Sequence, residues 1–382
     1  MRLALSADWL VTFGGAEHVL REFCTLFPEA PLFTTVARRR SLGPLGDRDI
    51  RTGKLQPWYR VLRNHQMLLP WMPAALEESD VRGYDVLLSS SHAIGKGLIP
   101  LSRMLHICYC HTPMRYAWEM EEQYLDDFRV PKILRPRIRR MLAQLRRWDL
   151  ASAKRVDLFI ANSQTTQERI KRIYARESIV IPPPVDDRFF LKATSNEPTR
   201  NEQRYFLAVG RLVPYKRFDL LIAAANELRV PLWIAGTGQE SDRLRSIAGE
   251  TVRFLGFVPD ADLPALYRGA KAVLFPQEED AGIVLREALA CGTPVIAYEA
   301  GGATEVIDDG KNGLFFDQQT KESLIDVLTR FSHARFDRET IRKSAESFSR
   351  KEFQEAIRGT VERAWEEFKK TLCYPHALPR FS

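Results

Sequence analysis

Residues 205–218 read YFLAVGRLVPYKRF. The first five, Tyr205–Val209, are apolar without polar alternation, which predicts a parallel strand buried on both faces. Gly210 follows the run, and the next loop carries two cations, Arg211 and Lys216. Open α/β sheets bind ligands at the carboxyl ends of their strands. This stretch therefore predicts a ligand-binding strand in a doubly wound sheet.

Similar apolar runs recur along the chain in two series, with helical patterns between them. The first series comprises Arg2–Ser6, Asp85–Ser89, His106–Cys110, Asp157–Ala161 and Ser178–Ile181. The second comprises Tyr205–Val209, Leu232–Ala235, Val252–Leu255, Ala272–Phe275 and Pro294–Ala297. Alternation of strands and helices predicts the α/β class. Two series predict two doubly wound, Rossmann-like domains, which we expect to face each other across a cleft.

The sequence also indicates where the two domains meet. Pro182-Pro183-Pro184 ends the last strand of the first series, because three prolines cannot continue a ladder. Residues 192–204 are polar and aperiodic and are interpreted as the linker. The charged helical segment Ile341–Lys370 could pack on either domain. The expected divisions are an N-terminal Rossmann-like domain at 1–190, a C-terminal Rossmann-like domain at 191–360, and a helix and tail at 361–382 that could pack back on the first domain.

Composition restricts the class of protein. The 382 residues are 45% hydrophobic and 27% charged, which is ordinary for a globular chain and excludes collagen-like, mucin-like and disordered classes. The net charge of +7 suggests anionic partners, such as phosphates, nucleic acid or an acidic membrane face. No apolar run approaches the roughly 18 residues of a membrane span, and we find no secretory signal. Five cysteines form no C-x-x-C pair. We therefore expect a cytoplasmic protein with reduced thiols.

Two glycines follow the first predicted strand. Gly14 and Gly15 open the first helix, where backbone N–H groups can approach a phosphate closely and the helix terminus adds partial positive charge. The alternative is a tight turn without a ligand. Arg211 and Lys216 can likewise bring two cations to one anion, or be two solvated surface charges.

A third segment, residues 276–288, leaves a predicted strand and becomes a helix near Gly282. Glu279 lies in its loop and Glu287 within the first two turns of the helix. Two carboxylates so placed can accept hydrogen bonds from sugar hydroxyls. The alternative is a solvated acidic loop.

Taken in order, these motifs resemble the retaining glycosyltransferases of family 4, which have the GT-B architecture. The resemblance covers most of the chain and rests on Gly210-Arg211, Lys216, the Glu279-x7-Glu287 pair, Gly301-Gly302-Ala303-Thr304-Glu305, Gly14-Gly15 and Asn162-Ser163-Gln164. His111 lies in YCHTPMRY, residues 109–116, a stretch similar to bacterial O-antigen and exopolysaccharide mannosyltransferases that use GDP-mannose. The chain departs from the family pattern at Pro182-Pro183-Pro184 and at Glu279-Asp280-Ala281-Gly282, which leaves the shape of the sugar pocket open.

The resemblance implies that the domain at 1–190 is the acceptor side and that the domain at 191–360 binds the nucleotide-sugar. It also implies a role for each matching residue. Gly14 and Gly15 would let the backbone approach the donor diphosphate, which Arg211 and Lys216 would bind. Glu279 would face the donor sugar, and His111 would lie beside the reacting sugar. Glu287 would bind the ribose, and Gly282 and Ile283 would lie beside the donor. Glu279 is interpreted as a sugar-hydroxyl ligand first and a nucleophile second. His111 could orient the sugar or handle a proton, or it could be a strand-end histidine that only caps a hydrogen bond.

The implied reaction is transfer of mannose from GDP-mannose, with retention, to a lipid-linked or growing polysaccharide acceptor in bacterial lipopolysaccharide or exopolysaccharide synthesis. Fixed cations beside the leaving diphosphate would replace the charge of a divalent ion, so we expect no metal and no cofactor. The strings Asp47-Arg48-Asp49 and Asp260-Ala261-Asp262 are interpreted as loop and helix-start sequences. A UDP-sugar donor, a GT-B nucleotide-sugar epimerase and a basic nucleic-acid-binding protein are the alternatives, although the aromatic-interleaved motifs of RNA modules are missing.

A basic helix is predicted in the first domain. Its apolar face carries Ile138, Met141, Leu142, Leu145 and Trp148, flanked by Arg135, Arg137, Arg139, Arg140, Arg146 and Arg147. A basic amphipathic helix with tryptophan is typical of binding to an anionic membrane surface. The alternative is an ordinary surface helix that packs its stripe on the sheet. Arg38-Arg39-Arg40 adds a second basic patch, and both would suit a lipid-diphosphate-linked acceptor.

Overall fold

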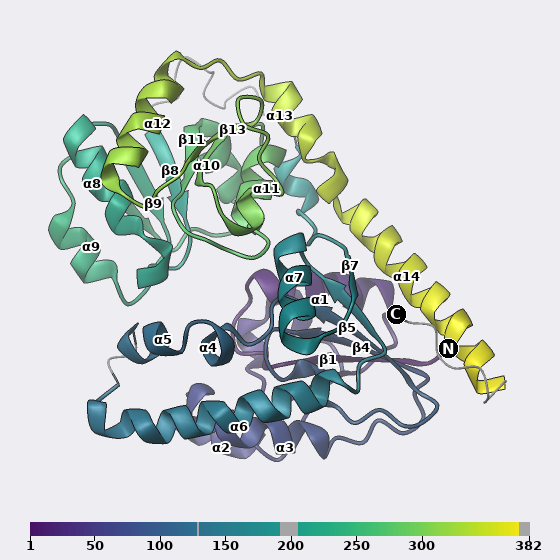
Figure 1. The fold of residues 1–382 in the computed structure, drawn as a ribbon. Coiled ribbons are helices and arrows are strands. Elements are labelled where there is room, and N and C mark those ends of the chain that lie inside the picture. Colours follow the sequence, from purple (N-terminus) through teal and green to yellow (C-terminus); the bar gives the residue numbers. More distant parts are fainter. Residues whose placement is uncertain (128–129, 192–204, 374–382) are drawn as a thin grey trace. The chain divides into compact units, whose positions relative to one another are not determined.

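The computed structural model describes residues 1–127, 130–191 and 205–373 (Figure 1). The chain forms two compact units, one comprising residues 1–182 with the C-terminal part from Phe353, the other comprising Pro183–Glu352. The boundaries expected at residues 190 and 360 lie a few residues C-terminal to these. The expected linker at 192–204 lies outside the described residues.

The first unit contains a seven-stranded sheet in the order β3-β2-β1-β4-β5-β6-β7, and every pairing is parallel. Its strands are β1 (Leu3–Ala7), β2 (Leu32–Thr34), β3 (Ile50–Thr52), β4 (Val86–Ser91), β5 (Leu105–Cys110), β6 (Leu158–Ala161) and β7 (Ser178–Val180). The five strands expected here are confirmed to within one or two residues. Strands β2 and β3 were not predicted; each has only three residues, and β3 carries the exposed Arg51 and Thr52.

The helices of the first unit connect these strands. They are α1 (Gly15–Leu26), α2 (Gln56–Leu62), α3 (Met72–Glu77), α4 (Arg115–Trp118), α5 (Glu121–Asp127), α6 (Arg135–Ala153) and α7 (Gln164–Tyr174), with the 3-10 helix η3 (Gln66–Trp71) before α3. The final helix, α14 (Arg350–Cys373), lies against this unit through Phe353, Ile357 and Val361, which join the core cluster of α1 and the sheet (Figure 1).

Burial explains why these strands are apolar throughout. Along β1, Leu5 belongs to the core cluster that includes α1 and α14, whereas its neighbour Ala4 belongs to a separate cluster that includes α3. Both side chains are fully buried. Successive residues of a strand point to opposite faces, so both faces of this sheet are covered. An alternating pattern would have exposed one of them.

The second unit contains a six-stranded parallel sheet in the order β10-β9-β8-β11-β12-β13. Its strands are β8 (Tyr205–Val209), β9 (Leu232–Ala235), β10 (Val252–Gly256), β11 (Ala270–Phe275), β12 (Val295–Tyr298) and β13 (Gly313–Phe316). Its helices are α8 (Phe218–Leu228), α9 (Ser241–Ile247), α10 (Leu263–Gly269), α11 (Ile283–Ala290), α12 (Lys321–His333) and α13 (Arg338–Ser344). The five expected strands are confirmed, and β13 is additional. The predicted α/β class with two Rossmann-like domains is therefore correct.

A buried ion pair fixes the segment after β4 in the first unit. The Lys96 ammonium donates to the Asp149 carboxylate of α6, and both side chains are almost completely buried. Asp149 also accepts hydrogen bonds from Trp118 Nε1 at 2.8 Å and Tyr174 OH at 2.9 Å. Burial alone lowers the pKa of Lys96, but the adjacent carboxylate more than offsets it, and the pKa is raised. The lysine is therefore charged.

Two further observations concern the membrane and the thiols. Among the helices that the structure describes, none combines the length and the apolar character needed to cross a bilayer. Cys24, Cys108, Cys110 and Cys291 are buried, and none of these four forms a disulfide.

Candidate functional site

In the second unit, the loop after β8 holds a buried lysine close to the backbone. Gly210 has φ +153°, and a Cβ atom at this position would lie 2.9 Å from Lys216 Nζ. Only glycine lets the lysine side chain pass this closely. Gly236, which follows β9, has φ +140°, and its Cβ would lie 1.8 Å from the Gly210 carbonyl oxygen. The loops after β8 and β9 therefore pack backbone to backbone.

Lys216 forms an ion pair with Glu279, one of the two predicted carboxylates. Lys216 Nζ lies 2.7 Å from Glu279 Oε1, and the side chains are 9% and 19% exposed. Burial lowers the pKa of Lys216, but the Glu279 carboxylate offsets this effect and the pKa is raised. Since an ammonium group has three N–H donors, the lysine retains donors for a second anion.

A glycine turn after β12 holds the backbone of Glu279. Gly302 N–H donates to the Glu279 carbonyl oxygen at 2.7 Å. Gly301 has φ +58°, and a Cβ there would lie 2.5 Å from the same oxygen. The Gly301-Gly302 pair thus positions the loop after β11. A Cβ at Gly302 would lie 2.3 Å from the carbonyl oxygen of Asp280, so both glycines allow the loop after β11 to pack against this turn.

Glu287 lies on α11 and has a separate environment. Gly282, at φ +59°, caps the helix, and Ile283 is its first residue. The half-buried Glu287 carboxylate accepts a hydrogen bond from Tyr267 OH at 2.8 Å. Burial raises its pKa to about 7, although the Tyr267 hydrogen bond opposes the shift. The carboxyl group therefore titrates near neutral pH.

The exposed Arg211 directly follows Gly210, in the loop after β8 that also carries Lys216. Its guanidinium group has no hydrogen-bond or ion-pair partner within the parts of the chain that the structure describes, and its charge is felt at Lys216. The structure therefore brings Lys216 and Glu279 into contact, with Arg211 on the same loop, and leaves Glu287 paired with Tyr267.

In the first unit, Gly14 and Gly15 lie at the start of α1, as predicted. Gly14 is the N-cap, and its N–H donates to the Glu17 carboxylate at 3.0 Å. The Glu17 carboxylate is therefore the anion that this N–H group already binds. Burial raises the pKa of Glu17. Gly15 has open space around its missing side chain, since no atom lies within 4 Å of a Cβ built there.

His111 directly follows β5. Its Nε2 atom lies 2.8 Å from Ser90 Oγ, and its ring centroid lies 6.5 Å from that of His92. Burial and the nearby His92 lower the pKa of His111 to about 3, so the ring is neutral at physiological pH. A neutral imidazole has one donor and one acceptor nitrogen. It can therefore orient a hydroxyl or exchange a proton, and the Ser90 contact fixes its rotation.

Two family models together match most of the chain. The model for "Glycosyltransferase Family 4" matches residues 13–189, and the model for "Glycosyl transferases group 1" matches residues 191–348.

The chain belongs to the family 4 type of glycosyltransferases.

Relatives and solved structures agree with this assignment. The glycosyltransferase chain is 30% identical to mannosylfructose-phosphate synthase of Agrobacterium fabrum over 71% of this chain and 66% of that protein. It is 37% identical to a GDP-mannose-dependent phosphatidylinositol monomannoside mannosyltransferase of Mycolicibacterium smegmatis over 36% and 42%, respectively. Anabaena HepE, solved with UDP, has TM-score 0.69 and 19% identity over 95% of this chain and all of that one, which shows the shared GT-B fold. The chain spans about half to two thirds of the length of its first curated relatives.

Sequence reasoning missed Asp8, a buried carboxylate directly after β1 in this glycosyltransferase. Asp8 accepts hydrogen bonds from Ser91 Oγ at 3.0 Å and from the backbone N–H of His92 at 2.8 Å and Ala93 at 3.1 Å, and His92 Nδ1 lies 2.7 Å away. Burial alone raises the pKa of Asp8, but His92 and these donors hold it well below its usual range. The available signal was a polar residue ending each of two neighbouring strands, β1 and β4.

The basic helix α6 behaves as a packed surface helix. Leu142 and Leu145 are buried, and Ile138, Met141 and Trp148 pack against the same core cluster. Three of its arginines pair with acids of α5: Arg135 with Asp126, Arg139 with Glu121 and Glu122, and Arg146 with Glu121. Arg137, Arg140 and Arg147 are exposed. The apolar face of α6 is thus covered by protein.

The two Asp-x-Asp strings occupy different places. Asp49 directly precedes β3 and pairs with Arg51, and Asp262 is the N-cap of α10. Within residues 1–127, 130–191 and 205–373, no group of three His, Cys, Asp or Glu side chains is arranged to hold a metal ion.

Proposed function

We propose that this chain is a retaining glycosyltransferase that moves mannose from GDP-mannose to a lipid-linked or growing polysaccharide acceptor in bacterial cell-surface glycan synthesis. The observation that carries the proposal is the buried Lys216–Glu279 pair, held by glycine turns at the carboxyl edge of the second sheet in a family 4 chain. In this arrangement Lys216 would bind a phosphate, and the adjacent Glu279 would accept a hydrogen bond from a sugar hydroxyl.

The chemistry required of the second unit is stabilisation of a leaving diphosphate. Negative charge grows on the leaving oxygen while the sugar becomes oxocarbenium-like. Preorganised donors aimed at such charge are usually the largest catalytic contribution, and loss of one costs about 2.7–4 kcal/mol. Arg211 and the remaining N–H donors of Lys216 would supply this charge, and we propose that no divalent metal is needed.

The remaining site residues are assigned to the rest of the donor. Glu279 would accept hydrogen bonds from sugar hydroxyls, and Glu287 from the ribose. Gly282 and Ile283 begin α11, where the helix terminus offers backbone N–H groups to the donor. In the first unit, Gly14 and Gly15 would let the diphosphate approach the backbone, and the diphosphate would have to displace the Glu17 carboxylate from the Gly14 N–H group. His111 would orient the transferred sugar, because its neutral ring is fixed by Ser90.

The choice of GDP-mannose is supported by residues 109–116 and by the name of the mycobacterial relative, which uses that donor. The HepE complex contains UDP. Retention follows from the resemblance to family 4. We place the reaction in the cytoplasm, at the inner face of the plasma membrane, where a lipid-linked acceptor would be presented.

A donor panel tests the proposal. GDP-, UDP- and ADP-sugars are compared by thermal shift, since a ligand that binds only the folded state raises its melting temperature. We expect GDP-mannose to give the largest shift. Turnover with donor alone is then followed by product NMR. An epimerised nucleotide-sugar released without acceptor would replace the transferase by an epimerase, and a larger shift with a UDP-sugar would overturn the choice of donor.

A further inference from the structure

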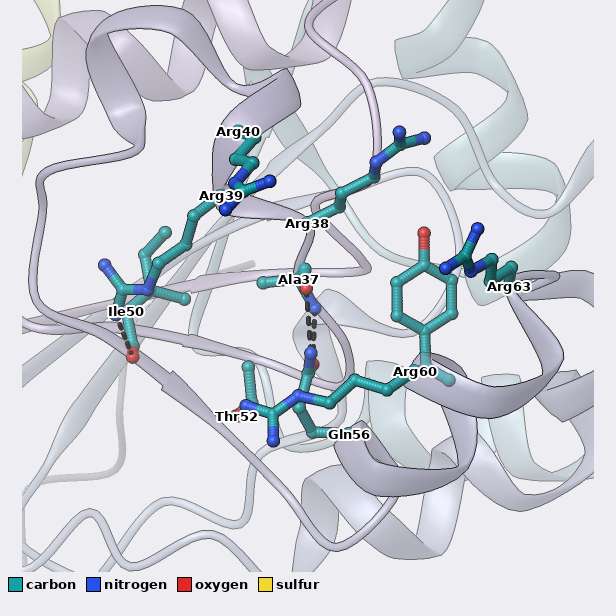
Figure 2. Close-up of a pocket in the computed structure, with 10 residues that line it drawn as sticks. Ala37, Arg38, Arg39, Arg40, Ile50, Thr52, Gln56, Arg60 and Arg63 are labelled. Carbon is teal, nitrogen blue, oxygen red and sulfur yellow. Dashed lines mark hydrogen bonds between the residues drawn. The ribbon is translucent and has the colours of Figure 1, made fainter.

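A basic pocket lies in the first unit and takes no part in the donor site proposed above. It has a volume of about 900 Å³, within the range of small-molecule sites. Five of its lining residues are arginines: Arg38, Arg39, Arg40, Arg60 and Arg63. Figure 2 shows that they come from two parts of the chain, the segment after β2 and the helix α2 with its C-cap residue Arg63. None of the described residues that line this pocket is acidic.

Most of these cations have no protein partner. Arg39 is fixed by three backbone carbonyl oxygens, those of Gly46, Arg48 and Ile50, at 2.9–3.0 Å. The other four guanidinium groups, of Arg38, Arg40, Arg60 and Arg63, make no hydrogen bond or ion pair with any residue that the structure describes, and all four are exposed. Guanidinium charges concentrated around one pocket repel each other unless an anion neutralises them. An anionic ligand would therefore be bound by several forked donors.

The walls of the pocket are ordered. Gln56 and Ala37 exchange two hydrogen bonds of 2.8 Å, one to and one from the backbone (Figure 2). Tyr59 is buried beside them. The Arg38 N–H donates to the carbonyl oxygen of Leu10 at 2.7 Å, which ties the pocket to the loop that follows β1. The pocket therefore lies at the same sheet edge as Asp8 and His111.

An apolar fringe adjoins the arginines. On α2, positions 56, 59 and 60 line the pocket together with the C-cap residue Arg63, whereas Trp58, Val61 and Leu62 are exposed by 63%, 78% and 40%. Met67 and Trp71 of the neighbouring η3 are exposed by 57% and 60%. Isolated exposed hydrophobic residues are common, but here five lie within fourteen residues of the chain, on α2 and the following η3. Tryptophan and aliphatic side chains beside arginines are typical of a membrane–water interface.

We propose that this arginine pocket binds the diphosphate group of a lipid-linked acceptor while the exposed side chains of α2 and η3 enter the membrane surface. The inference rests on the proposed transfer to such an acceptor and names the residues that would hold it. A soluble phosphate ester would satisfy the arginines but would leave the apolar fringe without a partner. The lipid diphosphate satisfies both, because it joins an anion to a hydrocarbon chain.

Vesicle sedimentation tests the proposal with the full chain. Phosphatidylcholine vesicles with and without a polyprenyl diphosphate are compared for the wild type and for R60A/R63A, R38A/R40A and W58S/V61S. The matched control is R137A/R140A, which removes two exposed arginines from α6 with the same change in net charge. We expect R60A/R63A and R38A/R40A to weaken binding to diphosphate vesicles roughly 25-fold, at about fivefold for each cation near an anionic surface. W58S/V61S should weaken it several-fold, and the control should bind as the wild type does.

Three results would overturn the inference: an equal loss in the α6 control, equal wild-type binding to vesicles without the diphosphate, or full competition by inorganic diphosphate together with unchanged binding of W58S/V61S. The last result would assign the pocket to a soluble phosphate. The GDP-mannose thermal shift is measured for every variant. A normal shift shows that a variant is folded and binds donor, whereas absence of the shift in the wild type would count against the proposed donor and not against the pocket.

Discussion

The titration of Glu287 makes the stability of the second unit depend on pH, and the same carboxyl group is assigned to donor binding. Burial raises the pKa of its carboxyl group from the ordinary 4.5 to about 7; the nearby Asp260 adds to this effect, while the Tyr267 hydrogen bond and Arg188 oppose it. Between these two values the folded chain holds a proton that the unfolded chain has released. The free energy of unfolding therefore falls as pH rises from about 4.5 to 7, and the loss is complete above 7. The full difference corresponds to about 3 kcal/mol, which partial exposure reduces to about 1–2 kcal/mol.

The substitution Glu287→Gln separates the two roles of this group. Glutamine keeps an acceptor for Tyr267 OH but remains neutral, so it removes the titration. At pH 8 we expect the variant to be more stable than the wild type by about 1–2 kcal/mol, or roughly 2–6 °C in melting temperature. At pH 5 the advantage should be almost gone. Donor binding should weaken at pH 8, because a hydrogen bond to a charged acceptor is stronger than one to a neutral amide by about 1 kcal/mol, roughly fivefold in affinity.

Thermal denaturation from pH 5 to 8.5, with and without GDP, measures both effects. The matched control is Glu250→Gln, which removes an exposed carboxylate from the same unit. It should show neither the stabilisation nor the loss of GDP binding. A stability difference for Glu287→Gln that is independent of pH, or a variant less stable than the wild type at pH 8, would refute the assigned titration. Unchanged GDP affinity would refute the ribose contact.

Three further substitutions test other parts of the structure. Asp149→Ala leaves the buried Lys96 ammonium unpaired and should cost about 3–5 kcal/mol in urea denaturation; a loss below 1 kcal/mol would show that the lysine charge is not held there. Gly236→Ala forces a Cβ against the preceding loop and should cost about 1–3 kcal/mol and weaken GDP binding, measured by calorimetry; wild-type affinity would contradict the backbone packing. Ser90→Ala frees the His111 ring and should lower kcat about tenfold or less with an unchanged donor KM; an effect on KM alone would contradict a positioning role.

The sequence predicted strands β1, β4–β7 and β8–β12, which include the edge strands β7 and β10. Runs such as Tyr205–Val209 are apolar because both faces of the sheet are covered, and this pattern is visible in the chain itself. The short strands β2, β3 and β13 were missed. In β3 only Ile50 is buried, while Arg51 and Thr52 are exposed, so the strand is recognised by its backbone pairing with β2 and not by its side chains.

The site residues also divide into those that can be recognised in the chain itself and those that can be recognised only in the fold. Lys216 and Glu279 follow β8 and β11, which are neighbours in the sheet, so the fold brings together two residues already selected from their loops. Asp8 and His92 also follow neighbouring strands, β1 and β4. Their pairing across 84 residues depends on strand order, which a single sequence does not reveal.

Amphipathic patterns have a similar limit. The stripe of α6 could face lipid or protein with the same periodicity, and only its packing against the first unit shows that it faces protein. The exposed Trp58 and Val61 of α2 give no regular pattern in so short a helix. Their proximity to the arginine pocket becomes visible in the fold.

Calorimetric titration of GDP in the presence of EDTA most directly tests whether Arg211 and Lys216, the fixed cations of the second unit, bind the donor diphosphate. The comparison is between the wild type and Arg211→Ala, because the exposed Arg211 guanidinium group makes no hydrogen bond or ion pair with any residue that the structure describes. We expect the wild type to bind GDP without a divalent ion and the variant to bind at least tenfold more weakly, the loss expected for one charge-assisted hydrogen bond. Binding that requires added magnesium or manganese, or equal affinity in the two proteins, would contradict the proposal.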